Sequence, residues 1–177
     1  EYVLEQAPMS ERTSMEVGGP AAYLFLPGNA EETAFLIKTL QTADFTYSIK
    51  GNGSNLLVHD EGYAGAIIEM MRMNRIEIEG TCVKAECGAM LKDIARLACD
   101  ASLSGFAFAC GIPGSLGGAI TMNAGAYDGE MSHVVSRVRT VNSTGGVHTY
   151  DAPNLGFSYR QSRFQKSQEF VVEVELT

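Results

Sequence analysis

Two glycine-rich turns hold the residues with the clearest chemical use in this sequence. The first turn is Gly51–Leu56, and the second is Gly111–Ala119, about 60 residues further along the chain. Glycine permits positive φ angles and leaves backbone N–H groups free to point at a ligand. Two such turns in one small chain predict a backbone that wraps a phosphorylated cofactor from two sides.

The elements predicted on either side of the first turn limit the kinds of binding site it can form. The sequence predicts a strand over Phe45–Lys50 before the turn and a strand over Leu56–His59 after it. A Rossmann fold or a P-loop needs a helix directly behind the glycines, so both are excluded. A plain strand connection stays open, because Asn-Gly is a common hairpin signal. Ser54 and Asn55 add hydrogen-bonding groups that a simple turn does not need, and they favour a binding loop.

The second turn interrupts an otherwise apolar stretch with glycines. These are Gly111, Gly114, Gly117 and Gly118. Each glycine costs roughly 0.5–1 kcal/mol relative to alanine inside a regular element, so the run indicates close approach of the backbone to a ligand. Tight packing between a helix and a sheet is the alternative. Pro113 is suited to the first turn of a short helix.

A third segment, Tyr159–Ser162, places an arginine beside aromatic residues, with Phe164 shortly after it. From the residues alone, Arg160 can be an ordinary surface cation that covers apolar area. The alternative is a binding or catalytic cation, and the segment by itself does not decide between the two.

Composition limits the partners of the chain. The formal net charge is −8 over 177 residues, which argues against nucleic acid because that kind of binding needs a basic face. The apolar runs are far shorter than the roughly 20 residues of a membrane span, and the start of the sequence has no basic-then-apolar signal region. We therefore expect a cytoplasmic protein that binds neither nucleic acid nor membranes.

The cysteines and histidines do not suggest a metal site. Cys82, Cys87, Cys99 and Cys110 have no CxxC spacing, and the three histidines are scattered. We expect buried, reduced thiols and no bound metal.

Hydrophobic periodicity divides the chain into two α+β units, residues 1–73 and residues 74–177. In the first unit, a strand over Ala22–Leu26 precedes a helix that Asn29 caps, with Glu32 three residues on. In the second unit, a hairpin crosses Gly80 and a helix follows. The last expected strands are Val134–Val141, Val147–Tyr150 and Val171–Leu176.

Four ordered motifs resemble one known family. They are Thr13–Ala21, Gly51–Val58, Gly111–Ala119 with Met122–Tyr127, and Phe157–Ser162. In order and spacing they resemble UDP-N-acetylenolpyruvoylglucosamine reductase, a flavoenzyme family of bacterial peptidoglycan synthesis. The resemblance covers the chain from about Thr13 to Leu176. The wider resemblance is to the vanillyl-alcohol-oxidase/PCMH-type FAD-binding fold, in which two α+β subdomains hold the flavin between them.

The resemblance implies roles for individual residues. The first turn would wrap the pyrophosphate of non-covalently bound FAD, and the second would lie along its ribityl chain and ring system. Tyr159 and Arg160 would bind substrate, with Arg160 as the catalytic arginine that contacts the substrate carboxylate. The implied cofactor contacts are Gly51, Asn52, Gly53, Ser54, Asn55, Leu56, Gly111, Ile112, Pro113, Gly114, Ser115, Gly117, Gly118, Ala119 and Asn123.

The implied reaction is the NADPH-dependent reduction of UDP-N-acetylglucosamine enolpyruvate to UDP-N-acetylmuramate. The family's C-terminal substrate domain, with a serine proton donor and a late catalytic glutamate, has no match in these residues. We therefore expect a monomeric FAD-binding portion of the reductase that is inactive by itself. The alternatives are another oxidoreductase of the same flavin fold, or a non-catalytic small-molecule-binding module whose glycines serve packing.

Overall fold

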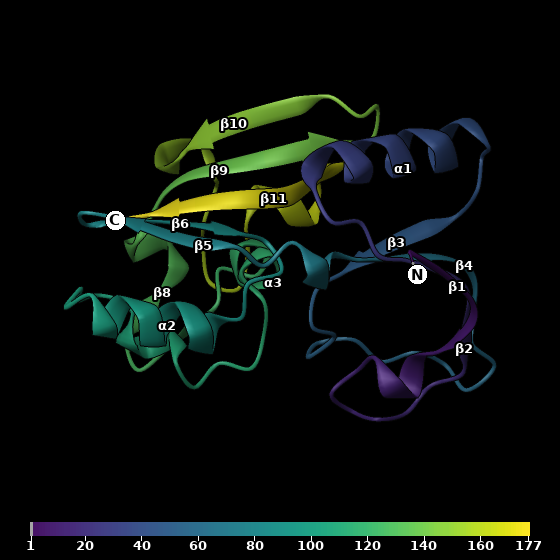
Figure 1. Cartoon of the computed structure of the whole chain (residues 1–177), viewed down its shortest axis with the longest axis horizontal. Coiled ribbons are helices and arrows are strands. Elements are labelled where there is room, and N and C mark those ends of the chain that lie inside the picture. Colours follow the sequence, from purple (N-terminus) through teal and green to yellow (C-terminus); the bar gives the residue numbers. More distant parts are fainter. Residues whose placement is uncertain (1) are drawn as a thin grey trace.

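A computed structural model describes residues 2–177, which form a four-stranded sheet, a five-stranded sheet and a short two-stranded ribbon (Figure 1). The first sheet contains β1 (Val3–Pro8), β2 (Pro20–Phe25), β3 (Tyr47–Lys50) and β4 (Tyr63–Glu69). The second contains β5 (Ile76–Glu79), β6 (Cys82–Glu86), β9 (Val135–Asn142), β10 (Val147–Asp151) and β11 (Glu169–Leu176). The ribbon pairs β7 (Gly125–Ala126) with β8 (Gly129–Glu130), and the helices are α1 (Ala30–Thr42), α2 (Leu91–Asp100) and α3 (Leu116–Thr121).

The first sheet has the strand order β1-β2-β4-β3. Strands β2 and β3 both run parallel to β4, so the chain needs a crossover connection, and α1 supplies it between β2 and β3. The predicted cap of α1 is confirmed. The Asn29 side chain accepts a hydrogen bond from the Glu32 N–H at 2.8 Å, and the Glu32 carboxylate accepts one from the Gly28 N–H at 2.7 Å.

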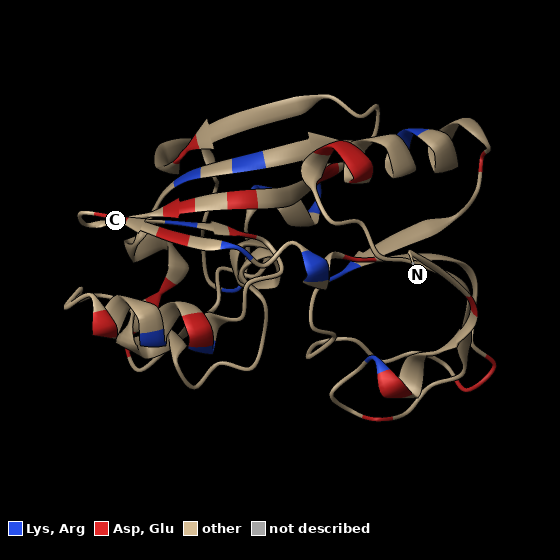
Figure 2. Ribbon diagram, in the orientation of Figure 1, with Lys and Arg blue, Asp and Glu red and all other residues tan. Residues whose placement is uncertain are grey.

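The second sheet is antiparallel, with the strand order β10-β9-β11-β6-β5. The predicted hairpin across Gly80 is confirmed as β5 and β6. In Figure 2, basic residues mark β9 and acidic residues mark the neighbouring strand β11. One cross-strand ion pair joins Lys84 to Glu173 at 3.3 Å, and another joins Arg137 to Glu175 at 3.2 Å. Helix α3 packs against β11 and β6 and brings the second glycine turn beside the sheet.

One hydrophobic core cluster continues across both sheets. It contains Ile37 of α1 and Ile68 of β4 from the first sheet region, and Val138 of β9 and Val174 of β11 from the second. Each of these side chains is at most 1% exposed. The expected division after residue 73 stays a prediction, because the strands sort into sheets on either side of it while the core crosses it.

Two sequence-based expectations about strands differ from the structure. The strand expected over Leu56–His59 is wrong, because this segment forms no ladder and Leu57 is 67% exposed. Instead, the His59 carbonyl accepts hydrogen bonds from the Gly19 and Gly62 N–H groups, both at 2.9 Å, and these bonds tie down an extended loop. Strand β1 was not predicted. Its residues are mostly exposed and it includes Gln6 at φ +50°, so no alternation marks it in the sequence.

Among the described residues 2–177, no helix has both the length and the apolar character that a membrane crossing requires.

Candidate functional site

The main candidate site is a cavity of about 1180 Å³ between the two sheets. Its walls come from β3, both glycine turns, α3 and the segment that leads into β11. Pockets for drug-sized ligands are typically about 300–1,000 Å³. This cavity is therefore large enough for a ligand the size of a dinucleotide.

Most of the residues that the sequence singled out meet at this cavity. Those that line it are Gly51, Asn52, Gly53, Ser54, Asn55, Leu56, Ile112, Pro113, Gly114, Ser115, Gly117, Gly118, Ala119 and Arg160. Gly111, Asn123 and Tyr159 lie outside its lining. The cofactor and substrate contacts assigned to all of these residues stay predictions.

The two glycine turns touch each other. A Cβ atom built on Gly51 would overlap the hydroxyl of Ser115, and one built on Gly114 would lie 3.4 Å from the hydroxyl oxygen of Ser54. In each turn, a glycine thus lies against the hydroxyl of a serine in the other turn. Gly53 has a further constraint, because its φ is +74° and an added Cβ would lie 2.5 Å from the Arg12 carbonyl oxygen. The first turn is therefore packed on two sides, against the second turn and against the Arg12 backbone.

In the second turn, the structure distinguishes a glycine that close packing requires from a glycine that packing does not require. A Cβ on Gly117 would lie 2.9 Å from the Cys87 Cβ, and the Gly117 N–H donates to the Cys87 carbonyl at 2.7 Å. Close packing between α3 and the sheet, the alternative explanation for the glycines, thus accounts for Gly117. A Cβ on Gly118 would meet only the Ser115 hydroxyl oxygen, at 3.8 Å, so packing does not require this glycine. Pro113 lies before the first turn of α3, whose N-cap is Ser115.

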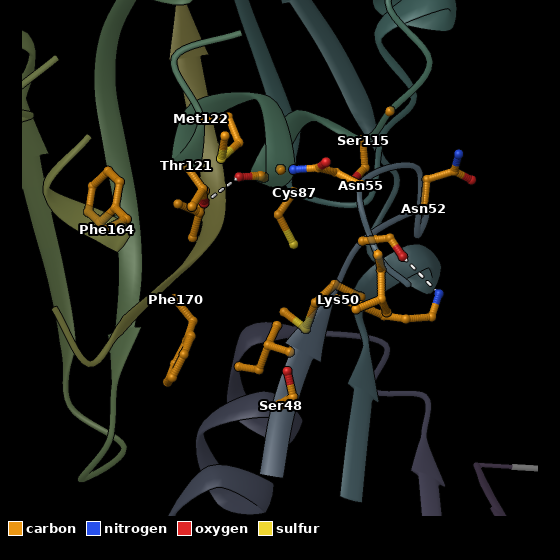
Figure 3. Close-up of a pocket in the computed structure, with 18 of the residues that line it drawn as sticks. Ser48, Lys50, Asn52, Asn55, Cys87, Ser115, Thr121, Met122, Phe164 and Phe170 are labelled. Atoms are coloured by element: carbon orange, nitrogen blue, oxygen red, sulfur yellow. Dashed lines mark hydrogen bonds between the residues drawn. The ribbon is translucent and has the colours of Figure 1, made fainter. Parts of the chain in front are cut away.

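The walls of the cavity differ in chemistry. In Figure 3, Asn52, Asn55 and Ser115 lie on one side of the space, and Phe164 and Phe170 lie on the other. A polar wall beside an aromatic wall suits a ligand that has both a polar chain and a flat ring.

Cys87 lies between these walls in Figure 3 and is 1% exposed. Burial raises the pKa of its thiol to about 12, with a smaller contribution from the nearby Glu86 charge. A thiol with such a pKa stays protonated at neutral pH and is therefore a poor nucleophile.

Arg160 sits at the edge of the cavity in a tight turn. The Ser158 and Gln161 backbones exchange hydrogen bonds of 3.1 and 3.0 Å, and Arg160 between them has φ +53°. Its guanidinium donates to the Gly125 carbonyl at 2.9 Å, and Tyr159 next to it is 83% exposed. A non-glycine residue in the left-handed region carries strain, and such residues concentrate at functional sites.

Asn123 is hydrogen-bonded to this turn through its side chain. Its side chain is buried, donates to the Ser158 carbonyl at 3.0 Å and accepts from the Ser132 N–H at 2.9 Å. Both polar ends of the amide are thus used within the protein. In this structure Asn123 fixes the position of the Arg160 turn.

Sequence reasoning missed a charged cluster behind the first turn. Lys50 and Glu69 are register partners at the ends of β3 and β4, and the Lys50 Nζ lies 2.6 Å from the Glu69 Oε2. Arg12 Nη1 lies 3.2 Å from the Glu69 Oε1. The available signal was a charged residue at the end of each of two apolar strands, but the sequence does not show that these ends are neighbours.

The fold and the cavity define a flavin-binding protein, and comparison with known proteins agrees. Residues 21–151 match the FAD binding domain family, and the chain belongs to that family, so FAD is its cofactor. The chain is 43% identical over 176 residues to UDP-N-acetylenolpyruvoylglucosamine reductase of Clostridium perfringens, strain SM101. It is also 43% identical over 172 residues to the Clostridium botulinum reductase, strain Hall. These matches cover 99% and 97% of this chain, which confirms the resemblance that the motifs indicated.

Solved structures agree with this assignment. The crystal structure of the same reductase (MurB) from Thermus caldophilus superposes with a TM-score of 0.82 at 32% identity, covering 99% of this chain and 60% of that one. Cholesterol oxidase from Brevibacterium sterolicum superposes with a TM-score of 0.73 at 15% identity, covering 99% of this chain and 37% of that one, and shows the shared fold. The predicted PCMH-type FAD-binding fold is thus confirmed. The chain spans 58% of the length of the Clostridium perfringens relative.

Proposed function

We propose that this chain is the FAD-binding part of an NADPH-dependent reductase that converts UDP-N-acetylglucosamine enolpyruvate to UDP-N-acetylmuramate. The observation that carries the proposal is the 43% identity to named reductases over 99% of this chain. The cavity supports it, because both glycine turns and Arg160 line one space.

The residues of the cavity fit FAD. The open position beside Gly118 leaves room for a ligand against α3, and the polar side chains of Asn52, Asn55 and Ser115 offer hydrogen bonds. Backbone N–H groups of the first turn bind a diphosphate without adding formal charge, which suits a chain of net charge −8. FAD, when bound, supplies two-electron redox chemistry.

Arg160 takes the substrate-side role in this proposal. Its guanidinium is anchored to the Gly125 carbonyl at 2.9 Å, and the tight turn holds its backbone in one conformation. A planar guanidinium held in this way pairs with a carboxylate in two parallel hydrogen bonds and stabilises the negative charge that develops there during reduction. The exposed ring of Tyr159 provides a neighbouring surface for the same substrate.

Several finer statements belong to the same proposal. We assign residues 1–73 and 74–177 to the two flavin-binding subdomains and expect a monomer. The four free cysteines support a reducing, cytoplasmic location. The expectation that they are buried is wrong for Cys99 and Cys110, which are exposed, and only Cys87 is fully buried. We expect the 177-residue polypeptide alone to show negligible turnover, because the proton-donor segment of the family has no match among its residues.

Two measurements test the proposal. The purified chain, reconstituted with FAD, should show a flavin absorption spectrum, and heating should release intact FAD that chromatography identifies. Failure of the folded chain to bind FAD would contradict the cofactor site. For the reaction, the chain is joined after Thr177 to the remaining part of the Clostridium perfringens relative. NADPH oxidation that requires the enolpyruvyl substrate supports the proposal, and oxidation indifferent to it refutes the proposed substrate.

A further inference from the structure

The charged cluster of Arg12, Lys50 and Glu69 lies directly behind the turn proposed to hold the cofactor diphosphate. The side chains of Lys50 and Glu69 are 5% and 9% exposed, and that of Arg12 is 31% exposed. A buried lysine–glutamate pair contributes little net stability, because desolvation offsets most of the attraction. Its position therefore calls for another explanation.

The cluster contains two cations and one carboxylate, which leaves one formal positive charge. The single carboxylate of Glu69 is shared, with Oε2 2.6 Å from Lys50 Nζ and Oε1 3.2 Å from Arg12 Nη1. Glu11, next to Arg12 in the sequence, lines the same small cavity but is exposed, so solvent screens its charge. Among the buried and half-buried side chains here, the surplus charge is positive. Because the cluster has little contact with solvent, water and salt screen its charge less than they screen a surface charge. Its electric field at neighbouring groups is therefore stronger.

The cluster is connected to the first turn in three ways. Lys50 Nζ donates to the Gly51 carbonyl at 3.0 Å, the contact drawn as a dashed line in Figure 3. The Arg12 carbonyl oxygen lies against Gly53. A second, smaller cavity of about 310 Å³ is lined by Asn52 of the turn together with Arg12, Lys50 and Glu69, and also by the exposed residue Glu11.

The position within the sheet also connects the cluster to the first turn. Strands β2, β3 and β4 run parallel, and Lys50 and Glu69 are paired at the carboxyl ends of β3 and β4. The first turn begins directly after Lys50, at this same end of the sheet. The surplus charge is thus placed beside the turn.

We propose that the Arg12–Glu69–Lys50 cluster supplies the positive charge that attracts the cofactor diphosphate to the Gly51–Leu56 turn. The three residues act through the field of their surplus charge, and the turn's backbone makes the contacts. This inference rests on the proposed cofactor position. It adds a charged, side-chain component to a site that the glycine turns alone describe as neutral.

The test measures FAD affinity in variants that change the cluster's charge. Arg12→Gln and Lys50→Met each lower the formal charge of the cluster from +1 to zero, and FAD affinity should fall roughly tenfold. Arg12→Lys keeps this charge and should stay near wild type. The double variant Lys50→Met/Glu69→Gln also keeps the charge at +1, through Arg12. It should recover most of the affinity lost in Lys50→Met, although it lacks the hydrogen bond to Gly51. Flavin fluorescence titration provides the dissociation constants.

Controls separate charge from structure. Arg75→Gln removes an exposed cation outside both cavities and should leave FAD affinity unchanged. Added NaCl should weaken FAD binding more in the wild type than in Arg12→Gln, because screening acts on the surplus charge. If Lys50→Met does not fold, Arg12→Gln decides the question, since that side chain is partly exposed.

Three results would overturn the inference. The first is wild-type affinity in Arg12→Gln. The second is a double variant as weak as Lys50→Met, which would make Lys50 a structural support of the turn. The third is a wild-type chain that cannot bind FAD, which overturns the proposed cofactor site as well. The first two leave the cofactor site standing, so the failures are distinguishable.

Discussion

Gly51 and Ser115 approach each other so closely that a side chain on Gly51 would overlap the serine hydroxyl. They belong to different glycine turns, one following β3 of the first sheet and the other preceding α3 beside the second. The reciprocal pair, Gly114 and Ser54, lies across the same junction. The shape of each turn therefore depends on the other, and a substitution in one turn is expected to affect the other.

Gly117 and Gly118 should respond differently to the same substitution. Gly117→Ala pushes a methyl group against the Cys87 Cβ and should lower the free energy of unfolding by about 1–3 kcal/mol. Gly118→Ala meets open space and should leave stability unchanged or raise it by up to about 1 kcal/mol through helix propensity. It should nevertheless weaken FAD binding. Urea unfolding without FAD and a fluorescence titration with FAD measure the two effects. Unchanged FAD affinity in Gly118→Ala would remove Gly118 from the cofactor site.

Gly53→Val should weaken FAD binding at least tenfold, which is about 1.4 kcal/mol. The φ of +74° disfavours a β-branched residue, and the Arg12 carbonyl leaves no space for one, so the turn must shift. Gly80→Ala is the matched control, because Gly80 also has a positive φ, of +60°, but no atom within 4 Å of an added Cβ. The control should lose some stability and keep FAD affinity. Equal FAD affinity in a folded Gly53→Val variant would show that the loop is only a turn.

Arg160→Lys should separate flavin binding from turnover in the protein joined to a relative's C-terminal part. The variant should keep its yellow colour and lose roughly 10²-fold in kcat, because lysine retains the charge but not the planar fork that grips a carboxylate. Steady-state NADPH oxidation measures the rate. Arg96→Lys changes an exposed arginine of α2 and serves as the control. Full activity in Arg160→Lys would exclude Arg160 from the mechanism.

Asn123→Ala should lower turnover in the same joined protein while FAD affinity stays near wild type. The substitution removes the hydrogen bond to the Ser158 carbonyl, which keeps its bond from the Gln161 N–H, and leaves the Ser132 N–H without its partner. The unpaired N–H costs about 1–3 kcal/mol, and the lost contact to Ser158 loosens the Arg160 turn. Comparing kcat with the FAD dissociation constant tests this directly. A large loss of FAD affinity with unchanged kcat would instead favour the cofactor contact that the sequence motif implied.

Cys87 should make stability depend on alkaline pH. Its pKa is raised from 9.0 to about 12, so the folded state retains a proton that the unfolded state releases. The corresponding stability is fully present below about pH 9 and is lost as pH rises toward about 12. The free energy of unfolding, measured in urea, should fall above about pH 9 more steeply for the wild type than for Cys87→Ala. Parallel pH profiles for the two proteins would contradict the buried thiol as the cause.

The sequence was sufficient wherever a local signal determines the structure. The cap at Asn29 and the hairpin at Gly80 depend on neighbouring residues, and both were predicted correctly. Strand β1 was missed because its residues are mostly exposed and lack alternation. The Leu56–His59 segment has strand-like composition, but its His59 carbonyl accepts hydrogen bonds from Gly19 in a distant loop and from Gly62 in the adjacent turn rather than from a strand.

The same distinction applies to the site. The glycine turns and Arg160 could be found from residue types and the family resemblance, and the cavity brings them together. The Lys50–Glu69 pair depends on the register of two parallel strands, which the chain does not encode locally. Similarly, adjacent glycines look equivalent in the sequence, and only the neighbouring Cys87 distinguishes Gly117 from Gly118.

The core that continues across the two sheets has a consequence for how the cofactor exchanges. Ile37 and Ile68 on one side belong to the same buried cluster as Val138 and Val174 on the other, so separating the sheets would expose apolar surface on both. We therefore expect the two sheets to unfold together, and a cofactor bound in the cavity would stabilise both at once. Exchange of the cofactor would then proceed by local movement of the glycine turns that line the cavity, at a free-energy cost below that of global unfolding.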